Sequence, residues 1–184
     1  MSRDDLCKPD GTAGEQDGID AQLSRRRRDV AAEWGPGDDV VLIGAGDPLP
    51  VPGRGDLTYP FRAHSEYYYL TDRNRPGGVL AFDAHEGWCD FVAPVTEGDR
   101  LWSGVRVGEQ DGIPMTDFAD WLAARSTRPI VCLGAPVSGV QFDAQRTAER
   151  RFGLSTVRRV KDAVELERMR AAESATSAAF AAVG

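Results

Sequence analysis

The chain has 184 residues, of which 41% are hydrophobic and 28% are charged, an ordinary composition for a globular protein. A chain of this length is expected to form one domain with an extra segment at an end, and to bury about two thirds of its unfolded surface without disulfide bonds. The formal net charge of −7 argues against nucleic acid or an anionic membrane surface as the partner.

The chain begins with a polar segment, residues 1–18, which we expect to be a disordered tail. It has no apolar core of the kind a secretory signal needs, and no apolar run elsewhere approaches the roughly 20 residues of a membrane span. Three cysteines, Cys7, Cys89 and Cys132, lack the spacing of a metal site, and the last two lie in apolar runs that predict core positions. We therefore expect a cytoplasmic protein with no membrane partner.

The first predicted elements are a helix and a buried strand. Residues 19–34 have helical apolar spacing, and Gly35-Pro36-Gly37 ends the helix. Residues 39–44 contain an unbroken apolar run that predicts a short buried strand. The Pro- and Gly-rich residues 46–58 then form a loop that is long enough to suggest a function.

An aromatic stretch, residues 59–71, follows this loop and is the densest in the chain. Pro60 cannot donate a ladder hydrogen bond, so the stretch should begin as irregular extended backbone. Tyr67-Tyr68-Tyr69-Leu70 predicts a strand, with the first and third tyrosines on one face and the second on the other. A strand that is aromatic on both faces should be covered on both sides, by helices or by another subunit.

In the rest of the chain, the predicted strands first follow one another directly and then alternate with helices. The expected strands are residues 79–83, 88–93, 129–133 and 154–157, and the expected helices are residues 116–125, 143–152 and 162–183. Turns at 75–78 and 85–87 join the earlier strands. The order predicts an α/β fold, with a mixed sheet that carries helices on both faces.

The last predicted helix is rich in alanine and has an apolar stripe that includes Leu166, Met169 and Phe180. Small residues allow close packing, but no later segment of the sequence is there to pack against. Two interpretations remain open at this point. The helix folds back on its own domain, or it opens a second domain that the sequence does not contain.

Two candidate motifs are better explained by structural roles than by ligand binding. Gly44-Ala45-Gly46 follows a strand but lacks the third glycine of a dinucleotide fingerprint. The run Arg25-Arg26-Arg27-Arg28 cannot form one patch, because helical spacing spreads four consecutive side chains around the helix, so we expect a solvated face with some carboxylate pairing.

Neither histidine predicts catalysis. His85 should lie exposed in a turn, and His64 in the aromatic stretch is expected to have a surface or interface role. A nucleophilic triad is disfavoured, because Ser65 adjoins His64 and neighbouring strand residues point to opposite faces. Asp72 and Asp83 are candidate metal ligands by residue type, but they should lie at opposite ends of a strand. We therefore expect no catalytic residue and no metal ligand in this chain.

Five motifs in one order resemble a known family. The motif Asp56-Leu57-Thr58-Tyr59-Pro60-Phe61-Arg62, with Ser65 and the tyrosine run, resembles the N-terminal domain of aminopeptidase P, in the creatinase-like, pita-bread metallopeptidase group. The other matching segments are Arg26-Arg27-Arg28, Pro76 with Val79-Leu80, residues 101–108, and residues 158–161 followed by Glu165, Arg168, Met169, Arg170 and Ala172. The resemblance covers residues 19–184. One departure is Asp72, where the family has glycine.

The resemblance implies a division of the chain. Residues 19–160 would be a creatinase-type N-terminal domain, and residues 161–184 would start the first helix of a catalytic domain that is absent. The domain would be non-catalytic, would help to build a homo-oligomer and would narrow access to the active site. The parent enzyme would cleave the bond between an N-terminal residue and a following proline, using two metal ions, usually manganese, held by its catalytic half. The chain alone should be inactive.

The resemblance also implies which residues contribute to substrate access or to an interface. Trp102 would reach the active site of a neighbouring subunit, with core packing as its alternative role. Tyr59, Arg62, Tyr68 and Arg106 belong to the same group of access or interface residues. Two other interpretations stay open: a stand-alone binding or oligomerisation module, and the N-terminal domain of a proline dipeptidase or creatinase, which the Tyr-Pro-Phe-Arg motif disfavours.

Overall fold

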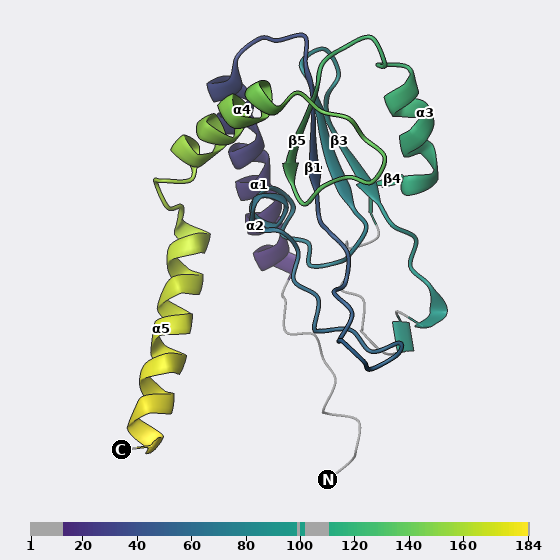
Figure 1. The fold of residues 1–184 in the computed structure, drawn as a ribbon. Helices are drawn as coiled ribbons and strands as arrows, with labels where there is room; N and C mark the ends of the chain where they lie inside the picture. The colour runs from purple at the N-terminus through teal and green to yellow at the C-terminus, as the bar shows by residue number, and fades with distance from the viewer. Residues whose placement is uncertain (1–12, 99, 102–110, 184) are drawn as a thin grey trace.

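The computed structural model describes residues 13–98, 100–101 and 111–183. The described residues form an α/β fold around a five-stranded mixed sheet, with strand order β4-β3-β2-β1-β5 and helices on both faces (Figure 1). The prediction of a mixed sheet between helices is confirmed.

The central strand β1 (Val40–Gly44) is buried along its whole length. It pairs antiparallel with β2 (Val79–Asp83) and parallel with β5 (Ile130–Gly134). β3 (Gly87–Val92) pairs antiparallel with β2, and the short β4 (Ile113–Pro114) pairs parallel with β3 at the edge. An apolar run on β1 is therefore required, because both of its faces are covered.

Helices cover the two faces unequally. α1 (Ala13–Trp34), α2 (Ser65–Thr71) and α4 (Ala144–Val157) lie on one face, and α3 (Phe118–Ala123), preceded by the 3₁₀ turn η2 (Met115–Asp117), lies on the other (Figure 1). Alternate residues of each strand serve alternate cores, as the period of two requires. On β1, for example, Val41 and Ile43 join the core under α1, α2 and α4, while Val40 and Leu42 join the core under α3.

An aromatic cluster closes each core. Ring centroids are 4.7 to 5.8 Å apart among Trp34, Phe82 and Trp88, and 5.2 to 6.5 Å apart among Phe91, Phe118 and Trp121. These separations are in the favourable range for tilted and edge-on rings. The aromatic side chains thus fill the space between the sheet and the nearest helix on each side.

Most predicted elements are confirmed, but α1 begins at Ala13 rather than at residue 19, so residues 13–18 are helical where a disordered tail was expected. The end of α1 at Trp34, the strands β1, β2, β3 and β5, and the last helix α5 (Ala163–Val183) all occur where they were expected. The free thiols of Cys89 and Cys132 are half-buried and buried, while Cys7 lies outside the described residues. Thr116 was expected to cap a helix, but α3 begins at Phe118, and the Thr116 hydroxyl instead donates to Asp117.

Two strand predictions are wrong. Residues 67–70 form most of the helix α2, and residues 154–157 form the last turn of α4. α4 continues through Gly153, where an added Cβ would lie 3.1 Å from Trp34 Cδ1, so α1 and α4 approach each other closely at this glycine. The two-residue strand β4 was not predicted.

Candidate functional site

The short helix α2 lies at the centre of the most distinctive polar arrangement in the fold. Its N-terminus is capped by His64, whose Nδ1 accepts a 3.3 Å hydrogen bond from the Glu66 amide. Its C-terminus is closed by Asp72, which adopts a left-handed conformation and donates its amide to the Tyr68 carbonyl oxygen at 2.8 Å. His64 is thus an exposed capping residue rather than one member of a triad.

The three consecutive tyrosines of α2 point in three directions, because helical residues are about 100° apart. Tyr67 is buried against the sheet, and this burial raises the pKa of its phenol to about 12. Tyr69 is buried against α1, with the Arg26 guanidinium 4.6 Å from its ring centre. Tyr68 is half-buried and faces α5, where its hydroxyl lies 3.4 Å from Arg168 Nη1.

The arginine run of α1 is only partly solvated, contrary to the sequence prediction. Arg25 and Arg28 are exposed, but Arg26 is 5% exposed and Arg27 is half-buried. Arg26 donates to the Tyr69 carbonyl oxygen at 2.8 Å, and Arg27 donates to the Leu70 carbonyl oxygen at 2.9 Å. The last carbonyls of a helix have no partner within it, so these two arginines satisfy the end of α2.

Arg26 also reaches the start of α5. Its Nε donates a 2.6 Å hydrogen bond to Asp162, which precedes the helix. Asp162 and Glu165 form a reciprocal cap, in which each backbone amide donates to the other side chain, at 2.9 and 3.3 Å. Burial raises the pKa of Asp162, but Arg26 and the Glu165 amide outweigh it, and the net pKa is lowered to about 2.

A second contact ties α5 to α2. The two terminal nitrogens of Arg168 donate to the two carboxylate oxygens of Asp72, at 2.5 and 2.8 Å. We call the whole arrangement the junction cluster; its members are Arg26, Tyr68, Tyr69, Asp72, Asp162 and Arg168. It joins α1, α2 and α5 through side chains that lie up to 136 residues apart in the sequence.

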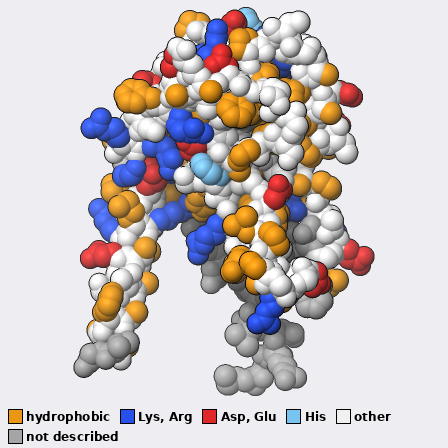
Figure 2. Space-filling view, viewed as in Figure 1, with side chains coloured by type: hydrophobic (Ala, Val, Ile, Leu, Met, Phe, Trp, Pro, Cys, Tyr) orange, Lys and Arg blue, Asp and Glu red, His pale blue; other side chains and the backbone are white. Residues whose placement is uncertain are grey.

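Beyond the junction cluster α5 projects away from the domain (Figure 1). Every residue from 166 to 182 is exposed, including Leu166, Met169 and Phe180, so α5 does not fold back on its own domain. Hydrophobic side chains stand along the projecting helix, while Lys and Arg side chains gather over α4 and the start of α5 (Figure 2). No helix within the described ranges is both long and apolar enough to cross a membrane.

The access and interface residues expected from the sequence are not brought together. Tyr68 belongs to the junction cluster, whereas Tyr59 and Arg62 are exposed on the long loop before α2. Backbone hydrogen bonds of 2.9 Å order this loop, from Val51 to Leu57 and from Tyr59 to Leu49. Trp102 and Arg106 lie outside the described residues. Tyr59 and Arg62 are accessible, as an interface would require.

The two acids considered as candidate metal ligands, Asp72 and Asp83, both form ion pairs with arginines. Asp72 binds Arg168, and Asp83 accepts from Arg125 at 2.8 Å and from Arg128 at 2.7 Å. Burial raises the pKa of Asp83, but its hydrogen bonds to the His85 amide and these arginines hold the net pKa well below its ordinary value. Within the part of the chain that is described, no group of three or more His, Cys, Asp or Glu side chains could hold a metal ion.

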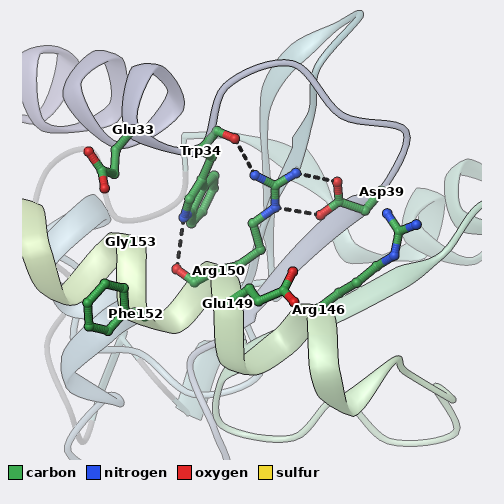
Figure 3. Close-up of a pocket in the computed structure, with 8 residues that line it drawn as sticks. All are labelled: Glu33, Trp34, Asp39, Arg146, Glu149, Arg150, Phe152 and Gly153. Carbon is green, nitrogen blue, oxygen red and sulfur yellow. Dashed lines mark hydrogen bonds and ion pairs between the residues drawn. The ribbon is translucent and has the colours of Figure 1, made fainter.

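A polar crevice of about 250 Å³ lies between the end of α1 and α4 (Figure 3). Arg150 fills one side of it, donating to both carboxylate oxygens of Asp39, at 2.8 and 2.5 Å, and to the Trp34 carbonyl oxygen. The Trp34 indole in turn donates to the Arg150 carbonyl oxygen at 2.9 Å. These paired groups fix α4 against α1, and Arg150 and Asp39 are each committed to the other.

Comparisons with known proteins agree on one family. Residues 23–127 match the family model described as aminopeptidase P, N-terminal domain. Xaa-Pro aminopeptidase 2 of Streptomyces coelicolor is 30% identical over 181 residues, covering 84% of this chain and 38% of that protein. Xaa-Pro aminopeptidase of Escherichia coli is 29% identical over 97 residues, covering 50% of this chain and 21% of that protein.

A solved structure shows the same fold. It is a Bacillus anthracis protein assigned to aminopeptidase P, with a TM-score of 0.51 and 12% identity, covering 72% of this chain and 35% of that one. At such low identity the likeness concerns the fold alone. The chain spans 38% of the length of the first curated relative that it matches.

Proposed function

The chain belongs to the aminopeptidase P N-terminal domain family, and on that premise we propose that it is the non-catalytic part of an Xaa-Pro aminopeptidase. The parent protein would hydrolyse the bond between an N-terminal residue and a following proline in peptides. The proposal is supported by relatives that are Xaa-Pro aminopeptidases and of which this chain spans only 38% and 21%. The single observation that carries it is the family match over residues 23–127.

The non-catalytic role is supported by the pairing of the buried and half-buried acids. Asp39, Asp83 and Asp162 are each bound to at least one arginine, and so is Glu66, whose Oε1 accepts from Arg151 at 3.1 Å. A carboxylate that is already neutralised by a guanidinium is a poor general base and a poor metal ligand. The described residues therefore do not fit the two metal ions, manganese in the usual case, that the family resemblance implies for a catalytic half. Such ions would supply an activated water, and their ligands would have to come from elsewhere in the parent protein.

We assign residues 19–160 to the N-terminal domain and α5 to the start of the catalytic domain. The exposure of every residue from 166 to 182 supports this, because an apolar helical stripe such as that of Leu166, Met169 and Phe180 ordinarily packs against another element. We propose that the catalytic domain packs against this stripe. The junction cluster would then connect the two domains.

The remaining parts of the proposal concern assembly and access. Tyr59 and Arg62 would contribute to a homo-oligomer interface, which their exposure on an ordered loop supports. Trp102 and Arg106, which the structure does not describe, are proposed from the resemblance to contribute to substrate access. A cytoplasmic location is proposed because free thiols at Cys89 and Cys132 suit a reducing compartment.

Sequencing the coding region beyond Gly184 tests the assignment. We expect an open reading frame that continues α5 and encodes the two Asp, one His and two Glu ligands that the family resemblance implies. A stop codon directly after Gly184 would instead favour the stand-alone binding or oligomerisation module. A continuation without that ligand set would exclude a metal-dependent peptidase.

A further inference from the structure

Asp72 occupies a backbone position that ordinarily selects glycine. Its φ of 54° and ψ of 19° are left-handed, and it is the only non-glycine residue with a positive φ among those the structure describes. The position directly after a helix is where glycine is most enriched, because a side chain is strained there. Aspartate tolerates this conformation better than most residues, but glycine would adopt it freely. An interaction of the Asp72 side chain should therefore account for its presence.

The side chain of Asp72 makes such an interaction with α5. Its carboxylate accepts from both terminal nitrogens of Arg168, which is the strong two-point geometry of arginine and carboxylate. The Asp72 side chain is only 11% exposed, whereas the Arg168 side chain is 41% exposed, so the pair lies at the edge of the surface with its carboxylate turned inward. Arg168 Nη1 also donates a 3.4 Å hydrogen bond to the Tyr68 hydroxyl oxygen.

The second anchor of α5 lies at its start. Asp162 binds Arg26 at 2.6 Å, and Arg168 follows six residues later along the same helix. The rise of a helix places these anchors about 9 Å apart. One anchor would leave a helix free to pivot, whereas two separated anchors fix its direction.

We propose that Asp72 and Arg168 form a clamp that sets the direction in which α5 leaves the N-terminal domain. The clamp itself concerns two described elements only; its consequence rests on the proposed function, in which α5 leads into the catalytic domain. α5 extends 15 residues beyond Arg168, to Val183, which corresponds to about 22 Å of helix. A tilt of 20° at the clamp would therefore displace the far end of the helix by about 8 Å. Asp72 is thus a positioning residue for whatever domain follows.

Distance measurements by double electron–electron resonance on the 184-residue chain test the clamp. Spin labels are attached to unnatural amino acids at two exposed positions, Ala148 on α4 and Ser177 on α5, so that the native cysteines stay in place. We expect a single narrow distance distribution in the parent chain. Asp72→Gly and Arg168→Gln should each broaden it at least twofold, while the control Arg170→Gln, also exposed on α5, should leave it unchanged.

The Asp72→Gly variant separates the clamp from general stability. Because glycine adopts the left-handed conformation freely, its urea midpoint should equal or exceed that of the parent chain although α5 is released. Asp72→Asn, which keeps the size and tolerates the backbone, should broaden the distribution as Asp72→Gly does. An unchanged width in Asp72→Gly and Arg168→Gln would overturn the clamp.

The outcome is independent of peptide hydrolysis. If the variants broaden the distance distribution but the parent protein lacks Xaa-Pro peptidase activity, the clamp is supported and the proposed function is wrong. If the parent protein is an active Xaa-Pro peptidase but the distance distributions of the variants are unchanged, the proposed function is supported and the clamp is wrong.

Discussion

The Arg26 guanidinium lies 4.6 Å from the centre of the Tyr69 ring and donates a 2.8 Å hydrogen bond to the carbonyl oxygen of the same residue. Its Nε simultaneously binds Asp162. One side chain of α1 therefore closes the end of α2 and holds the start of α5. The arginine run matters to the fold through this contact rather than through a charged surface.

Arg26→Ala should lower the free energy of unfolding by about 3 kcal/mol, because it leaves a poorly exposed carboxylate and a helix-terminal carbonyl without their partner. Urea denaturation of the 184-residue chain measures this. The matched control is Arg25→Ala on the same helix, whose exposed pair with Asp29 should be worth no more than about 0.5 kcal/mol. Equal effects of the two substitutions would contradict the junction cluster.

Stability should fall in acid partly through Asp162. Its pKa is about 2 in the folded chain and 3.8 ordinarily, so folding favours the ionised form. A depressed folded-state pKa contributes stability that is present above the unfolded pKa and is lost as pH falls through 4 toward 2. The contribution is about 2 kcal/mol.

Urea midpoints of the parent chain and Asp162→Asn, followed from pH 6 to pH 2, measure this loss. The difference between the two proteins should shrink as the pH falls. The control Ser177→Ala removes no titratable group at an exposed position of α5, and its difference from the parent chain should not change with pH. A difference for Asp162→Asn that stays constant with pH would contradict the role given to Asp162.

Gly78→Ala should destabilise the fold by about 2 kcal/mol, because overpacking of a filled core is costly. A Cβ at Gly78 would lie 2.4 Å from the buried Tyr67 hydroxyl oxygen. Tyr67→Phe removes that oxygen, so the cost of Gly78→Ala should be smaller in the Tyr67→Phe background. A double-mutant cycle of unfolding free energies measures the coupling, and strict additivity would refute the predicted clash.

Trp102→Ala in the parent enzyme should lower the rate of hydrolysis of a tripeptide with proline second by about tenfold, as the loss of one positioning contact of about 1.4 kcal/mol would do. The expectation comes from the family resemblance. Steady-state kinetics measure the rate, and the thermal midpoint of the same variant serves as the control for folding. Unchanged kinetics would remove Trp102 from substrate access, and a lowered midpoint would indicate its alternative role in core packing.

The sheet could be predicted from the sequence because its strands carry the signal locally. The unbroken apolar runs of β1, β2 and β5 lie in strands whose middle residues are buried, and such runs predict buried strands without knowledge of their neighbours. The end of α1 could be predicted from equally local information, because Gly35 adopts the left-handed conformation that terminates the helix.

The helix α2 was mistaken for a strand because three consecutive tyrosines have high strand propensity and the run is too short for a helical period. His64 caps α2 in the structure but is not among the residues that ordinarily signal a helix start, so the acidic Glu66 in the first turn was the only local signal and is weaker than the strand propensity. Three-dimensional packing decides the matter: a helix lets Tyr67 face the sheet, Tyr69 face α1 and Tyr68 face α5.

The junction cluster could not be predicted, because its pairs are distant in sequence. Arg26 and Asp162 are 136 residues apart, and Asp72 and Arg168 are 96 apart. One local signal was available for Arg26, which lies three residues after Leu23 and four before the buried Val30, and therefore on the apolar face of α1, whereas Arg25 does not. The partners of Arg26 could not be predicted, because the Tyr69 carbonyl oxygen and Asp162 are brought to it only by the docking of α2 and α5.

A peptidase assay tests the central claim most directly. The purified 184-residue chain and the longer protein that we propose its gene encodes are assayed side by side on a tripeptide with proline second, in the presence of manganese. The account predicts release of the N-terminal residue by the longer protein and none by the 184-residue chain. Hydrolysis by the 184-residue chain, or no hydrolysis by a folded longer protein, would contradict it.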